Sequence, residues 1–366
     1  MPTARAMVLE AFRQPLVLRE LPVIEPGPGE VRVRLEAAGV CGSDLHIAAG
    51  EDPRTPLPCI LGHEGVGRIE ALGGAMRDAE GNALRVGDRI TWDRGLTCGH
   101  CYYCTIRRQP YVCPERRTYG ISFSCSQPPH FLGCYSEVVH LLPDTRLLRV
   151  PDSVDPALIA IVGCSGAMAA HAIEEAQIAP GSSVVVLGPG PLGLFAVAFA
   201  RRRGAGQVIV AGTARSAARL EMARRLGATA QIVSDQMTAP ERLAAVRALT
   251  GGRGADVVIE GAGTPQAIAD GADYLAPGGA YALAGAAVPG EPLPVRIFEQ
   301  IVRKNARWQG IWAGDTVHLY QAIRWVLEDP DLYAPMITHR FTLEQANEAL
   351  AAVGERRAVK AVMRQA

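Results

Sequence analysis

A repeated alternation of short β-branched runs, glycine turns and helical segments in the second half of the chain constrains the fold most strongly. The run "SSVVVLG" (182–188) is typical of strands buried in parallel sheets, and "PLGLFAVAFARRRG" (191–204) is an amphipathic helix that ends in glycine. The segments 207–212, 216–228 and 255–263 continue the alternation. This pattern predicts an α/β domain with a doubly wound parallel sheet.

A glycine-rich turn follows the first of these strands. Gly188, Gly190 and Gly193 form a G-x-G-x-x-G pattern between a predicted strand and a predicted helix, which is the context that the motif requires. The glycines permit a tight turn and a close approach of the backbone to a pyrophosphate at the helix N-terminus. We therefore expect Gly188, Gly190, Pro191, Leu192 and Gly193 to bind a dinucleotide. An ordinary Gly-Pro turn is the alternative interpretation.

The end of the second predicted strand bears on which dinucleotide binds. The acidic residue that commonly contacts the adenine ribose about 20 residues after the glycines is missing, since the first Asp or Glu after Gly193 is Glu221. A carboxylate would repel a 2′-phosphate, whereas Arg, Ser and Thr side chains can donate hydrogen bonds to one. The sequence thus predicts NADP in preference to NAD, unless Arg215 is simply a solvated loop residue. The residues expected at the ribose are Gly212, Thr213, Arg215 and Ser216.

Four cysteines lie close together in the first half of the chain. Cys98, Cys101 and Cys104 are separated by two-residue gaps, and Cys113 follows after eight residues. Such spacing is typical of a closed, tetrahedral structural zinc site. A nucleic-acid-binding zinc ribbon and four unligated thiols are the alternatives. Lys and Arg total 37 and Asp and Glu total 37, so no overall positive charge favours nucleic acid.

Three further segments carry soft metal ligands. An isolated Cys or His is more often a core residue than a ligand. Here the three segments occur together, and the last of them precedes the glycine turn by 24 residues, which favours a second metal site. The segments are "GVCGSDLH" with Cys41, Asp44 and His46, "LGHEGVG" with His63 and Glu64, and "VGCSGAM" with Cys164.

Length and composition restrict the class of protein. A chain of 366 residues with 48% hydrophobic residues predicts two domains with sizeable cores. The N-terminal residues lack the apolar core of a signal peptide, and no run of about 18 apolar residues predicts a membrane span. We expect a cytoplasmic protein that acts on small molecules and binds neither membrane nor nucleic acid. In a reducing compartment, the nine cysteines are expected as ligands or packing residues.

Taken in order along the chain, these motifs resemble the zinc-dependent medium-chain dehydrogenase/reductase family, in its alcohol, polyol and threonine dehydrogenase group. The matching pieces also include "VGDRI", "GCYSEVV" and "LAPGGAYALAG". The resemblance implies a mainly β catalytic domain with a distorted, GroES-like barrel over residues 1–155. It further implies a Rossmann domain over 156–295 and a return segment over 296–366 that completes the catalytic domain. Members usually form homodimers or homotetramers.

The resemblance also implies roles for particular residues. Cys41, His63 and Cys164 would hold a catalytic zinc, with Glu64 as an alternative or transient ligand. Asp44 would orient the imidazole of His63. The other implied roles are proton transfer from the substrate hydroxyl through Ser43 to His46, and a structural zinc at Cys98, Cys101, Cys104 and Cys113. The gap before Cys113 is one residue longer than the family's common spacing, so this ligand is the least secure of the four.

The expected activity is reversible hydride transfer between a primary or secondary alcohol, or a polyol, and a nicotinamide cofactor, with two zinc ions per chain. The alternative is a non-catalytic, zinc-stabilised nucleotide-binding or regulatory protein. The sequence does not choose among polyols, amino alcohols, simple secondary alcohols and other hydroxy compounds as substrate.

Overall fold

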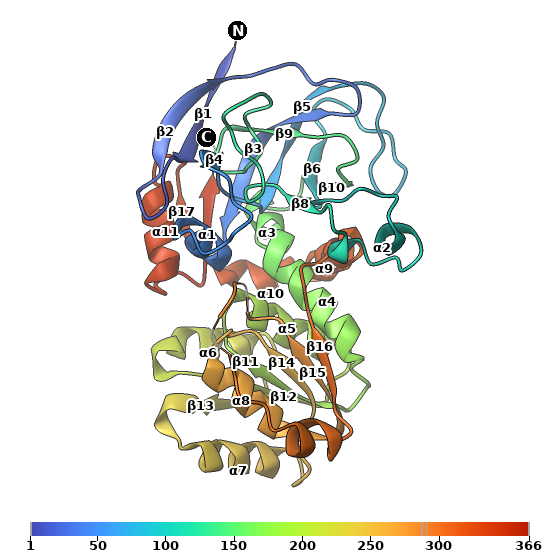
Figure 1. The fold of residues 1–366 in the computed structure, drawn as a ribbon, viewed down its shortest axis with the longest axis vertical. Helices are drawn as coiled ribbons and strands as arrows, with labels where there is room; N and C mark the ends of the chain where they lie inside the picture. The colour runs from blue at the N-terminus through green and yellow to red at the C-terminus, as the bar shows by residue number, and fades with distance from the viewer. Residues whose placement is uncertain (1, 287, 291, 365–366) are drawn as a thin grey trace. The chain divides into compact units, whose positions relative to one another are not determined.

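The computed structural model describes residues 2–286, 288–290 and 292–364, which divide into two compact units (Figure 1). The first unit comprises residues 1–164 and 314–366, and the second comprises 165–313. The boundaries expected from the sequence, after residues 155 and 295, lie nine and 18 residues before these two divisions.

A six-stranded, all-parallel sheet forms the centre of the second unit. Its strand order is β13-β12-β11-β14-β15-β16, the order of a doubly wound dinucleotide-binding sheet. The strands are β11 (Ser183–Leu187), β12 (Gln207–Gly212), β13 (Ala230–Val233), β14 (Ala255–Glu260), β15 (Leu275–Leu283) and β16 (Arg307–Gly310).

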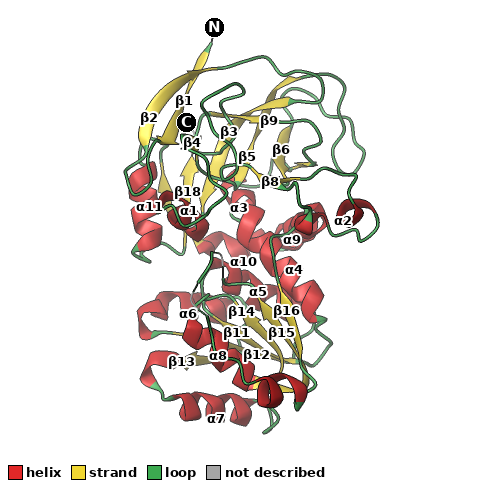
Figure 2. Ribbon diagram, in the orientation of Figure 1, coloured by secondary structure: helices red, strands yellow, loops and turns green. Residues whose placement is uncertain are grey.

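Five α-helices pack against this sheet (Figure 2). Buried apolar side chains such as Val185, Ile209 and Val258 fill the space between the layers, as expected for strands covered on both faces. The helices are α4 (Ala167–Ala176), α5 (Pro191–Arg202), α6 (Ala217–Arg225), α7 (Ala239–Leu249) and α8 (Pro265–Tyr274), with shorter turns η3 (Ala214–Ser216), η4 (Ser234–Gln236) and η5 (Ile297–Val302).

The first unit is mainly β, with a seven-stranded, a three-stranded and a two-stranded sheet. The three-stranded sheet has the order β2-β1-β4, and the small sheet pairs β7 with β8. The strands are β1 (Thr3–Leu9), β2 (Val17–Pro22), β3 (Val31–Val40), β4 (Cys59–Ile60), β5 (Gly65–Leu72), β6 (Arg89–Trp92), β7 (Gly95–Leu96), β8 (Arg117–Thr118), β9 (Val138–Leu141), β10 (Leu147–Arg149), β17 (Ile337–Phe341) and β18 (Lys360–Arg364).

The C-terminal segment is part of the main sheet of this unit. β18 lies between β3 and β17 and pairs antiparallel with β3, so that Ala361 is opposite Val40. The helical elements are α1 (Gly42–Ala48), α2 (Tyr102–Thr105), η1 (Pro110–Val112), α3 (Pro156–Ala160), α9 (Thr316–Glu328), α10 (Pro330–Tyr333), η6 (Ala334–Met336) and α11 (Ala346–Gly354), with η2 (Val162–Gly166) at the boundary of the units. The last strand of the chain therefore lies inside the main sheet, whose other strands apart from β17 come from the first half of the chain.

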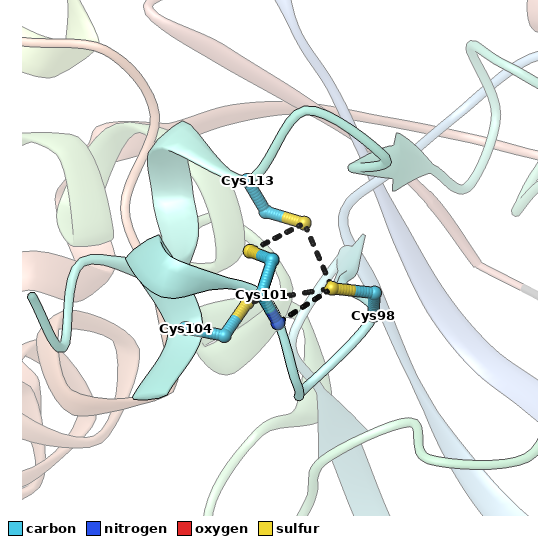
Figure 3. A group of neighbouring side chains, drawn as sticks. All are labelled: Cys98, Cys101, Cys104 and Cys113. Carbon is cyan, nitrogen blue, oxygen red and sulfur yellow. Dashed lines mark hydrogen bonds between the residues drawn. The ribbon is translucent and has the colours of Figure 1, made fainter. Parts of the chain in front are cut away.

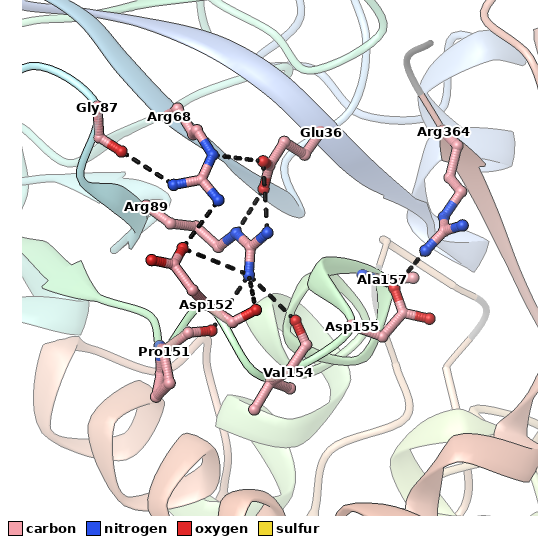
Figure 4. Close-up of polar contacts among 10 residues, drawn as sticks. All are labelled: Glu36, Arg68, Gly87, Arg89, Pro151, Asp152, Val154, Asp155, Ala157 and Arg364. Atoms are coloured by element: carbon pink, nitrogen blue, oxygen red, sulfur yellow. Dashed lines mark hydrogen bonds and ion pairs between the residues drawn. The ribbon is translucent and has the colours of Figure 1, made fainter.

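A buried arginine anchors the segment that leads into α3 (Figure 4). Arg89, which is 9% exposed, donates from Nη1 to the carbonyl oxygens of Pro151, Asp152 and Val154 at 3.1–3.2 Å. Its Nε donates to Glu36 at 2.5 Å. A cation that satisfies three backbone acceptors in a short segment fixes the path of that segment.

Asp155 caps the helix that follows. Its carboxylate accepts a 3.0 Å hydrogen bond from the Ala157 N–H and binds the guanidinium group of Arg364 (Figure 4). It also binds the guanidinium group of Arg340. Burial works to raise the pKa of Asp155, but the Ala157 N–H and the two arginines outweigh burial and lower it. The helix start is thereby tied to the return segment of the chain.

One helical stretch of the described residues, Pro156–Ala176, is long and apolar enough by composition to cross a membrane. It runs through α3, η2 and α4, and 89% of its most apolar window is buried inside the protein. Burial of this extent is typical of a core helix.

Candidate active site

Cys41 stands at the corner where β3 ends and α1 begins. Its backbone is extended and it occupies the N-cap position of the helix. Its N–H donates a 2.9 Å hydrogen bond to Asp44 Oδ2, which closes a capping box over the first turn. The local sequence therefore holds the Cys41 thiol at a defined helix start.

Asp44 also orients the imidazole of His63. The Asp44 Oδ1 lies 3.2 Å from His63 Nδ1, both side chains are fully buried, and Tyr135 donates its hydroxyl to Asp44 Oδ2 at 2.9 Å. The other ring nitrogen, Nε2, lies 3.3 Å from Ser43 Oγ. Burial opposes a charge on His63, but the Asp44 carboxylate and the Cys41 thiol outweigh it and raise the pKa of His63 to about 9. The surroundings thus favour positive charge at this ring.

Cys164 joins this group from a distant part of the chain. It lies in the π-helical turn η2, directly after α3, where the usual helical repeat is interrupted. The Cys41 and Cys164 sulfur atoms are 3.7 Å apart. That separation is close to the edge of about 3.8 Å expected for two thiolates on a tetrahedral zinc with bonds of about 2.3 Å.

The structure brings four candidate ligands together. One donor atom each from Cys41, His63, Glu64 and Cys164 lies within 4.8 Å of the others. The hydrogen bond with Cys164 lowers the pKa of the Cys41 thiol well below its usual value, despite burial. Two soft sulfurs and an imidazole match the donor set that zinc prefers, so these residues fit the metal.

Lys360 engages the fourth member of the group, Glu64. Its Nζ lies 2.6 and 2.7 Å from the two carboxylate oxygens of Glu64, and both side chains are at most 1% exposed. Any side chain at Gly39 would clash with this carboxylate, so the glycine in β3 makes room for it. With Glu64 paired, two cysteines and one histidine remain, which is a ligand set of catalytic zinc sites that keep a position open.

Three side chains that contact this group were not expected from the sequence. Lys360 pairs with Glu64, Tyr135 with Asp44, and Arg94 donates from Nη1 to Cys164 Sγ at 2.5 Å. A single lysine inside the apolar run "AVKAVM" was the one signal that could have revealed a buried ion pair.

The four-cysteine segment forms a second, closed group (Figure 3). Sulfur–sulfur distances are 3.6 Å between Cys98 and Cys113, 3.9 Å between Cys101 and Cys113, and 4.0 Å between Cys98 and Cys104. All four sulfurs lie within 4.8 Å of one another. Cys113 joins the group despite its longer gap, because η1 turns the chain back toward α2. These residues fit a tetrahedral zinc with no open position.

The glycine turn has the geometry that close backbone approach requires. Gly188 has φ +93°, a side chain at Gly193 would clash with the Gly188 carbonyl, and Gly190 is the N-cap of α5. Pro191 opens the helix, followed by Leu192. The N–H groups at this helix start have the arrangement that accepts a phosphate.

The turn after β12 contains the residues expected at the ribose. Gly212 ends the strand, Thr213 and Ser216 hydroxyls are 3.5 Å apart, and Arg215 is exposed. Asp235, in η4 just after the neighbouring strand β13, accepts a 2.8 Å hydrogen bond from the Ala214 N–H. This carboxylate was not among the residues expected from the sequence, because it follows β13 rather than β12.

His46 lies apart from the expected proton path. It is on α1, its side chain is 43% exposed, and its Nδ1 is 2.5 Å from Glu51 Oε2. Among the described residues no hydrogen bond joins the side chains of Ser43 and His46.

Comparisons with known proteins agree with this arrangement. The family model described as alcohol dehydrogenase GroES-like domain matches residues 27–152, and that described as zinc-binding dehydrogenase matches 191–328. The 5-exo-hydroxycamphor dehydrogenase of Pseudomonas putida is 34% identical over 351 residues, which cover 94% of each protein. The chain belongs to the zinc-dependent medium-chain dehydrogenase/reductase family.

Solved structures of this family share the fold. An alcohol dehydrogenase from Thermotoga maritima is 43% identical, with a TM-score of 0.95 over 100% of both chains. A zinc-binding dehydrogenase from Sinorhizobium meliloti 1021, solved with NADP, is 29% identical, with a TM-score of 0.85 over 100% of both chains. The family and the GroES-like plus Rossmann architecture predicted from the sequence are confirmed. As a member of this family, the protein is a zinc-dependent oxidoreductase that uses a nicotinamide cofactor and a small-molecule alcohol or carbonyl substrate.

Proposed function

We propose that this enzyme reversibly oxidises a primary or secondary alcohol, or a polyol, to the carbonyl compound, with NADP as hydride acceptor. The observation that carries the proposal is the ligand group of Cys41, His63 and Cys164, beside which the Glu64 carboxylate is already paired with Lys360. Three protein ligands with a free position are the mark of catalytic rather than structural zinc.

The zinc that these residues would hold supplies Lewis acidity, which makes a bound alcohol easier to deprotonate. The chain itself contributes the surroundings. Asp44 orients His63, so that its Nε2 faces the ligand group and Ser43 Oγ lies 3.3 Å away. The Ser43 hydroxyl can accept the proton of the substrate and pass it on. Because no hydrogen bond among the described residues joins the side chains of Ser43 and His46, the further transfer that we propose, from Ser43 to His46 and then to solvent, runs through a bridging water.

The cofactor part of the proposal rests on the second unit. The N–H groups at the start of α5, behind Gly188, Gly190 and Gly193, would bind the pyrophosphate. The exposed Arg215 and the hydroxyls of Thr213 and Ser216 support NADP over NAD, since β12 ends without a carboxylate. The bound NADP of the Sinorhizobium meliloti relative agrees with this choice.

We further propose two zinc ions per chain, one at Cys41, His63 and Cys164 and one at the four-cysteine group. The nine cysteines are all unpaired, which supports a reducing, cytoplasmic location. A homodimer or homotetramer is the expected assembly, and neither nucleic acid nor membrane is an expected partner. The non-catalytic alternative does not explain why a second ligand group keeps a position open.

The test is to load the protein with zinc, measure its metal content, and offer a panel of alcohols and polyols with NAD and NADP separately at mildly alkaline pH. We expect about two zincs per chain and reduction of NADP in preference to NAD. Turnover with NAD alone would refute the assigned role of Arg215 and leave the reaction intact. A single zinc per chain together with no turnover would refute the enzymatic proposal.

A further inference from the structure

Arg94 borders the candidate catalytic ligand group from a position that the reaction described above does not use. It follows β6, and its Nη1 donates to Cys164 Sγ at 2.5 Å. A guanidinium carries five N–H donors. Within the described part of the chain this is the one hydrogen bond of the Arg94 side chain, which is only half-buried. Most of its donors are therefore left for a ligand.

The charges around Arg94 leave it without a dedicated counter-ion. A dication at Cys41, His63 and Cys164 neutralises the two thiolates, and Lys360 neutralises Glu64. Asp44 is bound to His63 and receives hydrogen bonds from the Tyr135 hydroxyl and the Cys41 N–H. The charge of Arg94 is thus not matched by these anions.

A further carboxylate, Asp93, directly precedes Arg94 in the chain and already accepts hydrogen bonds from other residues. Its oxygens accept from the Gly95 N–H at 2.8 Å and from the Thr316 hydroxyl at 2.9 Å. A second arginine, Arg116, lies against Gly95, where any side chain at that position would clash with its guanidinium. Two guanidinium groups therefore adjoin one buried carboxylate.

Arg116 adds an unsatisfied donor to this corner. Its Nη1 donates to Thr118 Oγ1 at 3.0 Å, whereas its Nη2 is buried and has no partner among the described residues. Burial and the positive charges of Arg94 and Arg54 lower the pKa of Arg116 to about 10. Arg54 itself is paired with Asp52 through two hydrogen bonds. Positive charge without a counter-ion, together with unpaired N–H donors, favours the binding of an anion.

We propose that Arg94 is a specificity-determining residue that binds an oxyanion, either a carboxylate or a phosphate, carried by the substrate near its alcohol carbon. This inference rests on the proposed function and narrows its substrate class to hydroxy acids and phosphorylated alcohols. The positive charge of Arg116 adds to that of Arg94 and so strengthens the attraction for an anion. The planar fork of a guanidinium matches both kinds of oxyanion with paired hydrogen bonds.

Binding of simple anions tests this contact without turnover. Isothermal titration calorimetry of zinc-loaded protein with acetate, inorganic phosphate and neutral acetamide would be compared for wild type, Arg94→Gln, Arg94→Lys and a control, Arg117→Gln. Arg117 is an exposed arginine that lies over the Phe123 ring. We expect at least one anion to bind the wild type, and binding to weaken about 10- to 100-fold in Arg94→Gln. Arg94→Lys should lose less anion affinity than Arg94→Gln, and Arg117→Gln should bind the anion as the wild type does.

Three outcomes would overturn the proposal. The first is no binding of either anion to the wild type, and the second is unchanged binding in Arg94→Gln, which would mean that the metal alone holds the anion. The third is loss of one zinc per chain in Arg94→Gln, which would mean that Arg94 serves the Cys164 thiolate instead. If Arg94→Gln does not fold, anion binding by Arg94→Lys becomes the test. Binding by this variant equal to that of the wild type would count against the proposal.

Paired substrates separate this inference from the proposed function. The value of kcat/KM would be compared for butan-2-ol, 3-hydroxybutyrate and glycerol 3-phosphate. We expect one of the two anionic alcohols to be preferred by wild type and the preference to fall at least about 10-fold in Arg94→Gln. Turnover of butan-2-ol with no such preference would leave the proposed function standing and refute the inference. Anion binding that depends on Arg94, without turnover of any alcohol, would support the inference and count against the proposed function.

Discussion

The two candidate metal groups of this protein are built in opposite ways. The four cysteines Cys98, Cys101, Cys104 and Cys113 come from one short segment, and their sulfurs meet through local turns. Cys41, His63 and Cys164 come from three segments, and the first and last ligand are 123 positions apart in the sequence. Four cysteines would complete a tetrahedral metal site, whereas the second group offers three ligands once Glu64 is paired with Lys360.

The difference indicates what each group depends on. A local group needs only its own loop and a metal, and its formation stabilises that loop. A dispersed group needs the sheet register of β3 and β18, the anchoring of α3 and a buried ion pair to stay assembled. Damage to the first should therefore appear as lost stability, and damage to the second as lost activity.

The largest effect is expected from His63→Ala. Loss of one of three protein ligands should release the zinc of the dispersed group and lower turnover of the best alcohol by at least about 10⁴-fold. Zinc content by atomic absorption should fall from about two to about one per chain, with little change in folded content by circular dichroism. His339→Ala is the control, since His339 stacks on Phe341 away from both groups. Two zincs and full activity in His63→Ala would contradict the assignment.

Cys101→Ser should lower the stability of the protein and leave most of its activity. Because structural zinc contributes roughly 10 kcal/mol or more in small zinc domains, loss of one ligand should cost several kcal/mol of folding free energy. Denaturant unfolding should show this loss, and the protein that remains folded should keep most of its turnover. Cys125→Ser, at a buried cysteine outside both groups, is the matched control. Unchanged stability in Cys101→Ser would show that the local group holds no structural metal.

Lys360→Met tests the dependence of the dispersed group on distant residues. The substitution leaves the Glu64 carboxylate buried without its cation, which should cost about 3–5 kcal/mol. The double variant Glu64→Gln with Lys360→Met removes both charges and should recover most of that loss. Denaturant titration of wild type, the single variant and the double variant gives the coupling. Equal stability of wild type and Lys360→Met would mean that the ion pair is not needed to hold β18.

Asp155→Asn should give the smallest effect, at the start of the helix that leads to Cys164. Loss of the charged cap should cost about 1 kcal/mol at pH 7, with solvent screening the arginine partners. Because the folded-state pKa of Asp155 is lowered, this contribution exists above the unfolded-state pKa of about 3.9 and is lost as the pH falls through the folded-state value. The stability difference between wild type and variant should thus shrink below about pH 4.

The control for this experiment is Asp152→Asn, whose carboxylate is 74% exposed and pairs with Arg68. It should change the unfolding free energy by less than about 1 kcal/mol at any pH. A stability difference for Asp155→Asn that grew on acidification would contradict the direction of the pKa shift.

Much of the fold and the ligand set could be predicted because their signals are local. The strand, glycine turn and helix around Gly188 follow from backbone freedom and hydrophobic period, and the cysteine spacing follows from what one short loop can present to a metal. The resemblance to a family then grouped Cys41, His63 and Cys164, which no local rule joins. The unit boundaries were harder. The segment through α3, η2 and α4 has one continuous helical composition, and the strand-and-helix alternation fades from about residue 295, before β16.

By itself, the sequence determined the parallel sheet with its glycine turn, the four-cysteine loop and the candidate ligands of a second metal. Only the tertiary structure decided which partners surround those ligands. Lys360 reaches Glu64 across 296 residues, Tyr135 reaches Asp44 across 91, and Arg94 reaches Cys164 across 70. These contacts arise from strand register and the packing of distant segments. Neither residue type nor spacing in the sequence identifies the partner of each buried charged group.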